Sequence, residues 1–169
     1  KKRLTLQKSF KRMDDIIKEL STVEKFTSKN HHILKENITY VDLFNRTVEL
    51  TMMDSKSIET NEVDFNLYID IYMFTIVLKN LIDNAVKFSS DKKAHINASK
   101  EKIIVSSYGP KLKEELDYYT DAFTQEEKRK DGFGLGLYIV KTVVDLHGFN
   151  LDYKYIDGMN NFIINIKED

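Results

Sequence analysis

Three polar residues lie on one side of an otherwise apolar stretch at residues 74–90, FTIVLKNLIDNAVKFSS. Asn80, Asn84 and Lys87 are spaced so that, in a helix, their side chains point the same way. Amide oxygens can ligate Mg²⁺, and an ammonium group can bind phosphate. The stripe therefore fits an anion that carries a metal ion, although an ordinary solvated helix face would show the same residue types.

A second stretch, GFGLGLYIVK at residues 132–141, places Gly132, Gly134 and Gly136 at alternate positions before a segment that predicts a helix. The free backbone N–H groups and the positive dipole end of such a helix start can bind phosphate. Glycines also serve plain turns, so the cluster gains its weight from the combination with the polar stripe upstream.

Together the two stretches resemble the ATP-binding domain of sensor histidine kinases, in the wider group that shares the Bergerat nucleotide fold. NLIDNAVKFS is similar to the asparagine box of that family and GFGLGLYIVK to its second glycine box; the similarity runs from about Asn37 to the C-terminus. It implies ATP and Mg²⁺ as cofactors, with Asn84 as the Mg²⁺ ligand. It also implies that Asn80 and Lys87 contact the phosphates and that Phe88 packs near the adenine.

Further family motifs are matched between and beside these boxes. In Ser106-Ser107-Tyr108-Gly109 the resemblance to the first glycine box holds at Gly109, but Ser107 stands where the family has the Asp that recognises the adenine amino group. Lys111 replaces the second glycine of that box, so adenine selectivity and affinity are both in question; a plain strand-ending turn is the alternative. Asp121-Ala122-Phe123 resembles the phenylalanine box, and residues 124–131 resemble the ATP lid. The full ATP-binding set implied by the resemblance is Asn80, Asn84, Lys87, Phe88, Ser107, Gly109, Phe123, Lys130, Gly132, Gly134, Leu135 and Gly136.

The residue at position 80 also bears on the reaction. Hydrolytic members of the wider fold have a Glu there as a general base, and Asn80 cannot remove a proton, which favours a kinase over an ATPase. The family's phosphoacceptor motif is a His followed by an acidic residue, Arg and Pro, and none of the four histidines matches it. We therefore assign no catalytic residue, and expect His147 to cap a helix end or to interact with its dipole.

The amino-acid composition limits which kinds of partner and of binding site remain possible. The 169 residues are 41% hydrophobic and 31% charged, which permits a real core. The net charge of −1 gives no basic field for nucleic acid, and the absence of cysteine excludes disulfides and thiolate metal sites. No apolar run reaches the length of a membrane span, so we expect membrane attachment only through missing upstream segments.

Residues 4–26 predict a long helix with an apolar seam of the kind found in helix bundles, formed by Leu6, Phe10, Met13, Ile17 and Leu20. The resemblance places here the second helix of a dimerisation bundle, whose first helix carries the phosphoacceptor His and is missing from the chain. A helix packed on its own domain is the alternative. We expect a partial bundle at residues 1–30, a linker at 31–36 and the ATP-binding domain at 37–169.

The remaining pattern predicts strands at 37–40, 57–63, 65–69, 94–99, 102–107, 149–156 and 161–167, with a turn at Asp157-Gly158. It predicts helices at 41–53, 70–90 and 111–120 and another after the glycine cluster. The expected fold class is α+β: a two-layer α/β sandwich of the Bergerat type, in which helices cover a mixed, mostly antiparallel sheet. An N-terminal bundle helix precedes it.

The predicted function is the ATP-binding catalytic part of a two-component sensor histidine kinase. The γ-phosphoryl would pass to a His on the missing bundle helix and then to an Asp in the receiver domain of a response regulator. We expect a homodimer through the bundle helix, in the cytoplasmic portion of an inner-membrane sensor protein. One alternative is a pseudokinase or scaffold that binds nucleotide poorly, to which the Ser107 and Lys111 departures point. Another is a serine kinase of the anti-sigma-factor type, against which the bundle helix argues.

Overall fold

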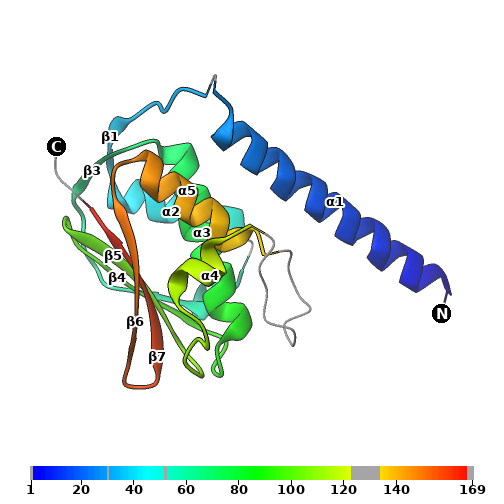
Figure 1. The fold of residues 1–169 in the computed structure, drawn as a ribbon. Coiled ribbons are helices and arrows are strands. Elements are labelled where there is room, and N and C mark those ends of the chain that lie inside the picture. Colours follow the sequence, from blue (N-terminus) through cyan, green and yellow to red (C-terminus); the bar gives the residue numbers. More distant parts are fainter. Residues whose placement is uncertain (1, 30, 52, 123–133, 167–169) are drawn as a thin grey trace.

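The computed structural model describes residues 2–29, 31–51, 53–122 and 134–166, with only the backbone of residues 2–4. Helices pack on one face of a sheet, and one long helix extends beside them (Figure 1). The helices are α1 (Lys2–Thr27), α2 (Tyr40–Thr51), α3 (Ile71–Phe88), α4 (Leu116–Thr120) and α5 (Gly136–Leu146), with a 3₁₀ turn at Ser55–Ser57. The strands are β1 (Glu36–Thr39), β2 (Ile58–Thr60), β3 (Asn66–Ile69), β4 (Ala94–Ala98), β5 (Lys102–Tyr108), β6 (Asn150–Ile156) and β7 (Met159–Asn165).

The main sheet has the strand order β2-β4-β5-β7-β6, in which only the β2–β4 pair is parallel. This mixed, mostly antiparallel sheet under helices confirms the predicted fold class. The predicted hairpin is also confirmed: Asp157 and Gly158 take φ values of 51° and 77°, which suit a two-residue turn between β6 and β7. β1 and β3 form a separate two-stranded antiparallel sheet, which the pattern did not predict.

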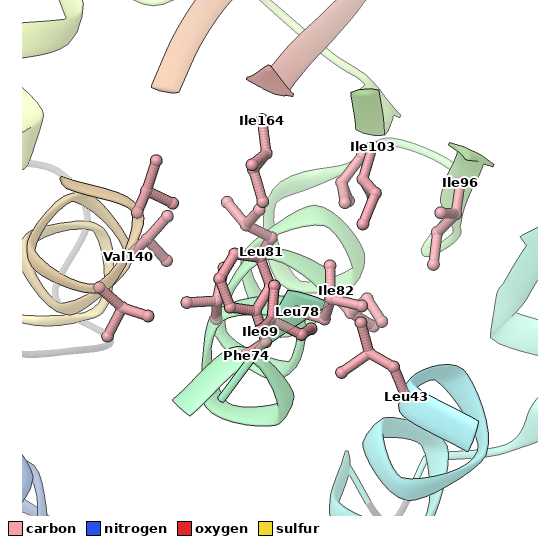
Figure 2. Packing of buried hydrophobic residues seen from close by; sticks show 14 of the residues in the cluster. Leu43, Ile69, Phe74, Leu78, Leu81, Ile82, Ile96, Ile103, Val140 and Ile164 are labelled. Carbon is pink, nitrogen blue, oxygen red and sulfur yellow. The ribbon is translucent and has the colours of Figure 1, made fainter. Parts of the chain in front are cut away.

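The core lies between the sheet and α3. Asp70 caps α3 by accepting a hydrogen bond from the Met73 N–H at 3.1 Å, and this cap fixes where the helix begins. Apolar side chains of α3 at helical spacing then point at the sheet and at the flanking helices (Figure 2). Figure 2 places Leu43 of α2 and Val140 of α5 on either side of them, with Ile103 and Ile164 above. The helix is thus held on three sides, which fixes the direction of its polar stripe.

Two predicted elements are shorter than expected, each because a side chain occupies backbone groups. The helix predicted at 111–120 begins only at Leu116, and the Tyr119 hydroxyl accepts hydrogen bonds from the N–H groups of Lys113 and Glu114 at 3.1 and 3.2 Å. The strand predicted at 57–63 ends at Thr60. There the Asn61 side chain bonds both the C=O and the N–H of Ala98 at 2.9 Å and replaces the ladder.

The apolar contacts that hold α1 on the sandwich lie near its C-terminal end. Phe26 is buried, and its ring meets Tyr72 edge-on with a centroid distance of 6.2 Å. Val23 packs beside it against Ile139 of α5. The rest of α1 runs past the sandwich (Figure 1), and its predicted apolar seam is exposed.

Candidate functional site

The polar stripe of α3 faces the start of α5. Asn80 donates from Nδ2 to the C=O of Gly136 at 3.4 Å. Nδ2 of Asn84 lies 3.8 Å from the position that a Cβ on Gly136 would take. Both amides are half-buried, whereas Lys87 is exposed. The structure thus brings the two stretches that the sequence analysis combined, residues 80–87 and 134–136, to one place.

The start of α5 offers open backbone donors at that place. Gly134 has φ of 70°, a left-handed conformation that favours glycine, and the buried Leu135 follows as the N-cap residue. Leu135 has no side-chain oxygen, and no side-chain cap hydrogen bond is made to this helix in the described part of the chain. The first N–H groups of α5 therefore point beyond the helix end, where an anion could accept from them.

An apolar pocket adjoins this helix end. It lies between α3, the end of β5, the α4 segment and β7, and three of its lining side chains are polar: Asn84, Ser107 and Asn160. The other lining residues are Ala85, Phe88, Pro110, Leu112, Tyr119, Leu137 and Phe162. A slot of this kind suits a flat aromatic ring whose edge is read by a few hydrogen bonds.

The predicted ATP-binding residues divide between this pocket and a neighbouring groove. Asn84, Phe88 and Ser107 line the pocket. Asn80 and Lys87 line a groove between α1 and α3, and the Lys87 ammonium lies 5.3 Å from the centroid of the Phe88 ring. The two cavities are therefore joined by the polar stripe of α3, with an apolar part on one side and a charged part on the other.

Gly109 lies at the rim of the pocket, but its backbone conformation does not require glycine. A Cβ there would lie 3.5 Å from the Phe88 carbonyl oxygen and 3.6 Å from Asn160 Nδ2, which are ordinary contacts. Its N–H donates to Gly158 at 3.1 Å and its C=O accepts from Tyr155 at 3.2 Å. The predicted residues Phe123, Lys130 and Gly132 lie outside the described residues.

Two residues of the site were not predicted from the sequence: Asn160, which lines the pocket, and Tyr153, which bonds to it. Asn160 accepts at Oδ1 from the Tyr153 hydroxyl at 2.6 Å and donates from Nδ2 to the Pro110 C=O at 3.1 Å. The Tyr153 hydroxyl in turn accepts from the Leu112 N–H at 3.2 Å. Burial raises the pKa of Tyr153, which keeps its phenol a donor. Only the register of β7 against β5 brings Asn160 to this place, and residue spacing gave no signal for it.

The groove between α1 and α3 is rich in charge. Its α1 side presents Glu19, whose Oε2 is buried and has no hydrogen-bond partner among the described residues. Burial raises the pKa of Glu19, while the nearby Lys79 and Lys87 act to lower it. The other charged lining residues are Lys8, Lys11, Arg12, Asp15 and Lys18.

The side chains at the site fit a Mg²⁺ ion that takes one or two ligands from the protein, and they do not provide a complete set of protein ligands. No group of three or more His, Asp or Glu side chains that could hold a metal ion occurs in the described ranges. Mg²⁺ needs only one or two protein oxygens when phosphate and water supply the rest, and the Asn84 amide oxygen at the pocket mouth meets that need. Of the histidines, His95 contacts Glu59 and Asp91, and His147 is buried at the C-terminal end of α5; neither lines the pocket.

Among the helices described, none combines the length and the apolar character that crossing a membrane requires.

Comparison with known proteins gives consistent matches. Residues 70–168 match the family of histidine kinase-, DNA gyrase B- and HSP90-like ATPases. The sensor histidine kinase ArsS of Helicobacter pylori is 31% identical over 160 residues, which is 92% of this chain and 38% of ArsS. This chain therefore spans well under half of that relative.

Solved structures share the fold. Histidine kinase AdeS of Acinetobacter baumannii superposes with a TM-score of 0.70 at 18% identity, covering 96% of this chain and 81% of that one. Full-length ShkA in complex with AMPPNP gives a TM-score of 0.71 at 19% identity, covering 95% of this chain and 36% of ShkA. The fold likeness includes α1 in both cases, because nearly the whole chain is covered.

Proposed function

We propose a function for this chain from the premise that it belongs to the family of histidine kinase-, DNA gyrase B- and HSP90-like ATPases, with sensor histidine kinases among its relatives. The chain binds Mg-ATP in the pocket beside α3 and at the neighbouring start of α5. It supplies the γ-phosphoryl group to a His on a bundle helix outside this chain, for relay to an Asp of a response regulator.

One observation carries the proposal: an apolar slot, a metal-ligating amide and an uncapped helix start meet at Asn84. The adenine enters the slot beside Phe88 and Ser107, and the phosphates lie at the start of α5 near Gly136. Asn80 and Lys87 bind the phosphates from the side of the groove. Phe123, Lys130, Gly132, Gly134 and Leu135 complete the proposed set, together with Gly109 at the rim.

Residue types favour transfer to a protein acceptor over transfer to water. Asn80 bonds the Gly136 carbonyl and has no group that could take a proton from water. Mg²⁺, held through Asn84, would neutralise charge that develops on the phosphates. The chain's own contribution is then to orient the nucleotide and to expose its γ-phosphate toward the groove beside α1.

The arrangement of α1 supports a partner role. Its seam residues Leu6, Phe10, Met13, Ile17 and Leu20 are between 41% and 65% exposed, which is a large apolar stripe to leave in water. We propose that residues 1–30 form part of a dimerisation bundle, that 31–36 link it to the ATP-binding domain at 37–169, and that the whole is the cytoplasmic portion of an inner-membrane sensor protein.

Nucleotide-dependent stabilisation tests the binding site. Thermal unfolding would be followed in the presence of ATP together with either Mg²⁺ or EDTA. The unmodified chain would be compared with Asn84→Ala. Ligand at 100 times its Kd stabilises a folded protein by about 2.7 kcal/mol, or several degrees in Tm. We expect a Mg²⁺-dependent rise that Asn84→Ala abolishes.

Asn45→Ala on the exposed face of α2 is the matched control and should keep the full shift. An unchanged Tm at millimolar Mg-ATP would contradict the proposal and favour a scaffold. In the full-length protein, Asn84→Ala should also abolish the acid-labile, base-stable phosphate expected of phosphohistidine.

A further inference from the structure

The floor of the pocket is built from two neighbouring polar side chains. Ser107 of β5 and Asn160 of β7 are direct partners in the antiparallel register, so their side chains emerge on the same face. Val105 and Ile103, two and four residues before Ser107, are buried, and Figure 2 shows Ile103 pointing toward the helices. Strand alternation therefore turns Ser107 and Asn160 toward α3 and into the pocket.

The hydrogen bonds of Asn160 fix which of its groups remains available. Its Oδ1 accepts from Tyr153 at 2.6 Å and one Nδ2 hydrogen goes to the Pro110 carbonyl at 3.1 Å. An amide has two N–H donors, so the second hydrogen of Nδ2 remains for a ligand. Asn160 thus presents a donor at the floor.

Ser107, in contrast to Asn160, can offer a ligand either a donor or an acceptor. It is 8% exposed and lines the pocket, and its hydroxyl has no hydrogen bond to any residue in the described part of the chain. A hydroxyl rotates about its C–O bond and can either donate or accept. A carboxylate at the same place could only accept, and would therefore select a base edge that carries an amino group.

We propose that Ser107 and Asn160 set the base selectivity of this pocket, and that it accepts 6-oxopurine as well as 6-aminopurine nucleoside triphosphates. The inference rests on the proposed nucleotide site. With a 6-aminopurine, the Ser107 hydroxyl accepts from the amino group on C6 and the open Asn160 N–H donates to the unprotonated ring nitrogen N1. With a 6-oxopurine, whose N1 carries a hydrogen, the Ser107 hydroxyl and the Asn160 N–H both donate to the oxygen on C6. Of the other lining residues, Asn84 lies beside the start of α5 and is assigned to the metal ion, and the rest, such as Phe88 and Leu112, present apolar surface to the flat ring.

The test compares Mg-ATP with Mg-ITP, which differ at this edge of the base, by isothermal titration of the chain. Sites that bury a mismatched hydrogen-bonding group can reject an analogue by about 10⁴-fold or more. We expect instead that the Kd values differ by less than about tenfold. Ser107→Asp should raise the ITP-to-ATP ratio of Kd to above about 100-fold, because its carboxylate faces the base oxygen.

Ser107→Ala is a second variant, which keeps the test informative if Ser107→Asp does not fold. It should weaken both nucleotides by a similar factor of about three to ten and leave the ratio unchanged. The matched control is Ser106→Ala, because the Ser106 hydroxyl bonds Asn161 Oδ1 at 2.6 Å and does not line the pocket. ATP binding with ITP at least about 100-fold weaker in the unmodified chain would overturn this inference but not the proposed function. Failure of both nucleotides to bind would overturn both.

Discussion

His147 joins three parts of the molecule through a neutral ring. Its Nε2 accepts from the Asp70 N–H at 3.0 Å, so the ring proton sits on Nδ1, which donates to the Val143 carbonyl at 2.8 Å. The Phe74 ring meets it edge-on at 4.7 Å. On the linker side, Asp70 Oδ2 accepts from the Leu34 N–H at 3.1 Å. The predicted cap at the end of α5 is therefore a neutral histidine that also positions the cap of α3.

Acidification should weaken the fold through this ring. Burial lowers the pKa of His147 from its ordinary 6.5, with Lys35 acting in the same direction and Asp70 in the opposite one. Well above pH 6.5 the ring is neutral in both the folded and the unfolded state. As the pH falls below 6.5 the unfolded chain takes up the proton first, so the free energy of unfolding should fall until the folded pKa is reached. The slope can approach about 1.4 kcal/mol per pH unit.

Urea unfolding between pH 7.5 and 5.5 measures that slope, and His147→Gln should lose this part of it while being less stable throughout. His32→Gln, at an exposed position in the linker, is the control and should follow the unmodified chain. Parallel pH profiles for the chain and for His147→Gln would show that the ring does not contribute.

At the scale of elements, sequence periodicity was sufficient where one face of a helix decides its position. The apolar spacing of residues 74–88 predicted α3 and hence the direction of Asn80 and Asn84. Burial of the apolar face fixes how the helix is rotated about its axis, and this rotation determines where the polar stripe points. The start of α4 was wrong because it depends on Tyr119, a side chain that competes for backbone donors. The helix propensity of residues 111–120 does not account for a side chain that binds the backbone N–H groups.

Strand pairing limited the prediction of the site. Ser107 was singled out from its place in a motif, but Asn160 reaches the pocket only because β7 pairs with β5 in one register. A shift of one residue would turn Asn160 to the opposite face. The separation of β1 and β3 from the main sheet is likewise a matter of pairing, which composition does not encode.

Glu19 opposes the docking of α1 onto the sandwich. Its Oε2 is buried without a partner in the described ranges, and its pKa is raised by burial against the pull of Lys79 and Lys87. A carboxyl group whose folded pKa lies above its unfolded value stabilises the fold only in its protonated form. This contribution is lost as the pH rises through that interval, so the charged form is unfavourable at neutral pH.

Glu19→Gln should therefore raise Tm at pH 7.5 by roughly 1–3 °C, since it removes the buried charge and keeps the shape. Glu24→Gln is the matched control, because Glu24 is exposed on the same helix and should leave Tm unchanged. The difference between Glu19→Gln and the unmodified chain should shrink as the pH approaches 4.5, measured by thermal unfolding across pH. A Tm lowered by Glu19→Gln would mean that attraction to the lysines outweighs burial.

At the scale of the whole molecule, α1 divides its two faces between two tasks. Phe26 and Val23 hold its C-terminal end on the sandwich, while the side chains of its apolar seam are exposed. Most of the helix extends away from the sandwich (Figure 1). About four turns of exposed apolar side chains are unfavourable in water, and a second copy of the same seam would cover them. No seam residue lines the nucleotide pocket, so assembly and binding should be separable.

Charged residues placed in the apolar seam of α1 should abolish dimer formation and leave nucleotide binding intact. We expect the unmodified chain to be a dimer by light scattering at micromolar concentration, and the double variant Phe10→Asp with Ile17→Asp to be a monomer, because burying two carboxylates against their own copies costs several kcal/mol. The Mg-ATP-induced rise in Tm should survive in that monomer, since Asn84 and Ser107 are untouched. Ser21→Asp, on an exposed position of the same helix outside the seam, should leave the dimer intact. A monomeric unmodified chain would mean that α1 needs the preceding bundle helix to assemble, and loss of the nucleotide response in the double variant would mean that the pocket depends on the dimer.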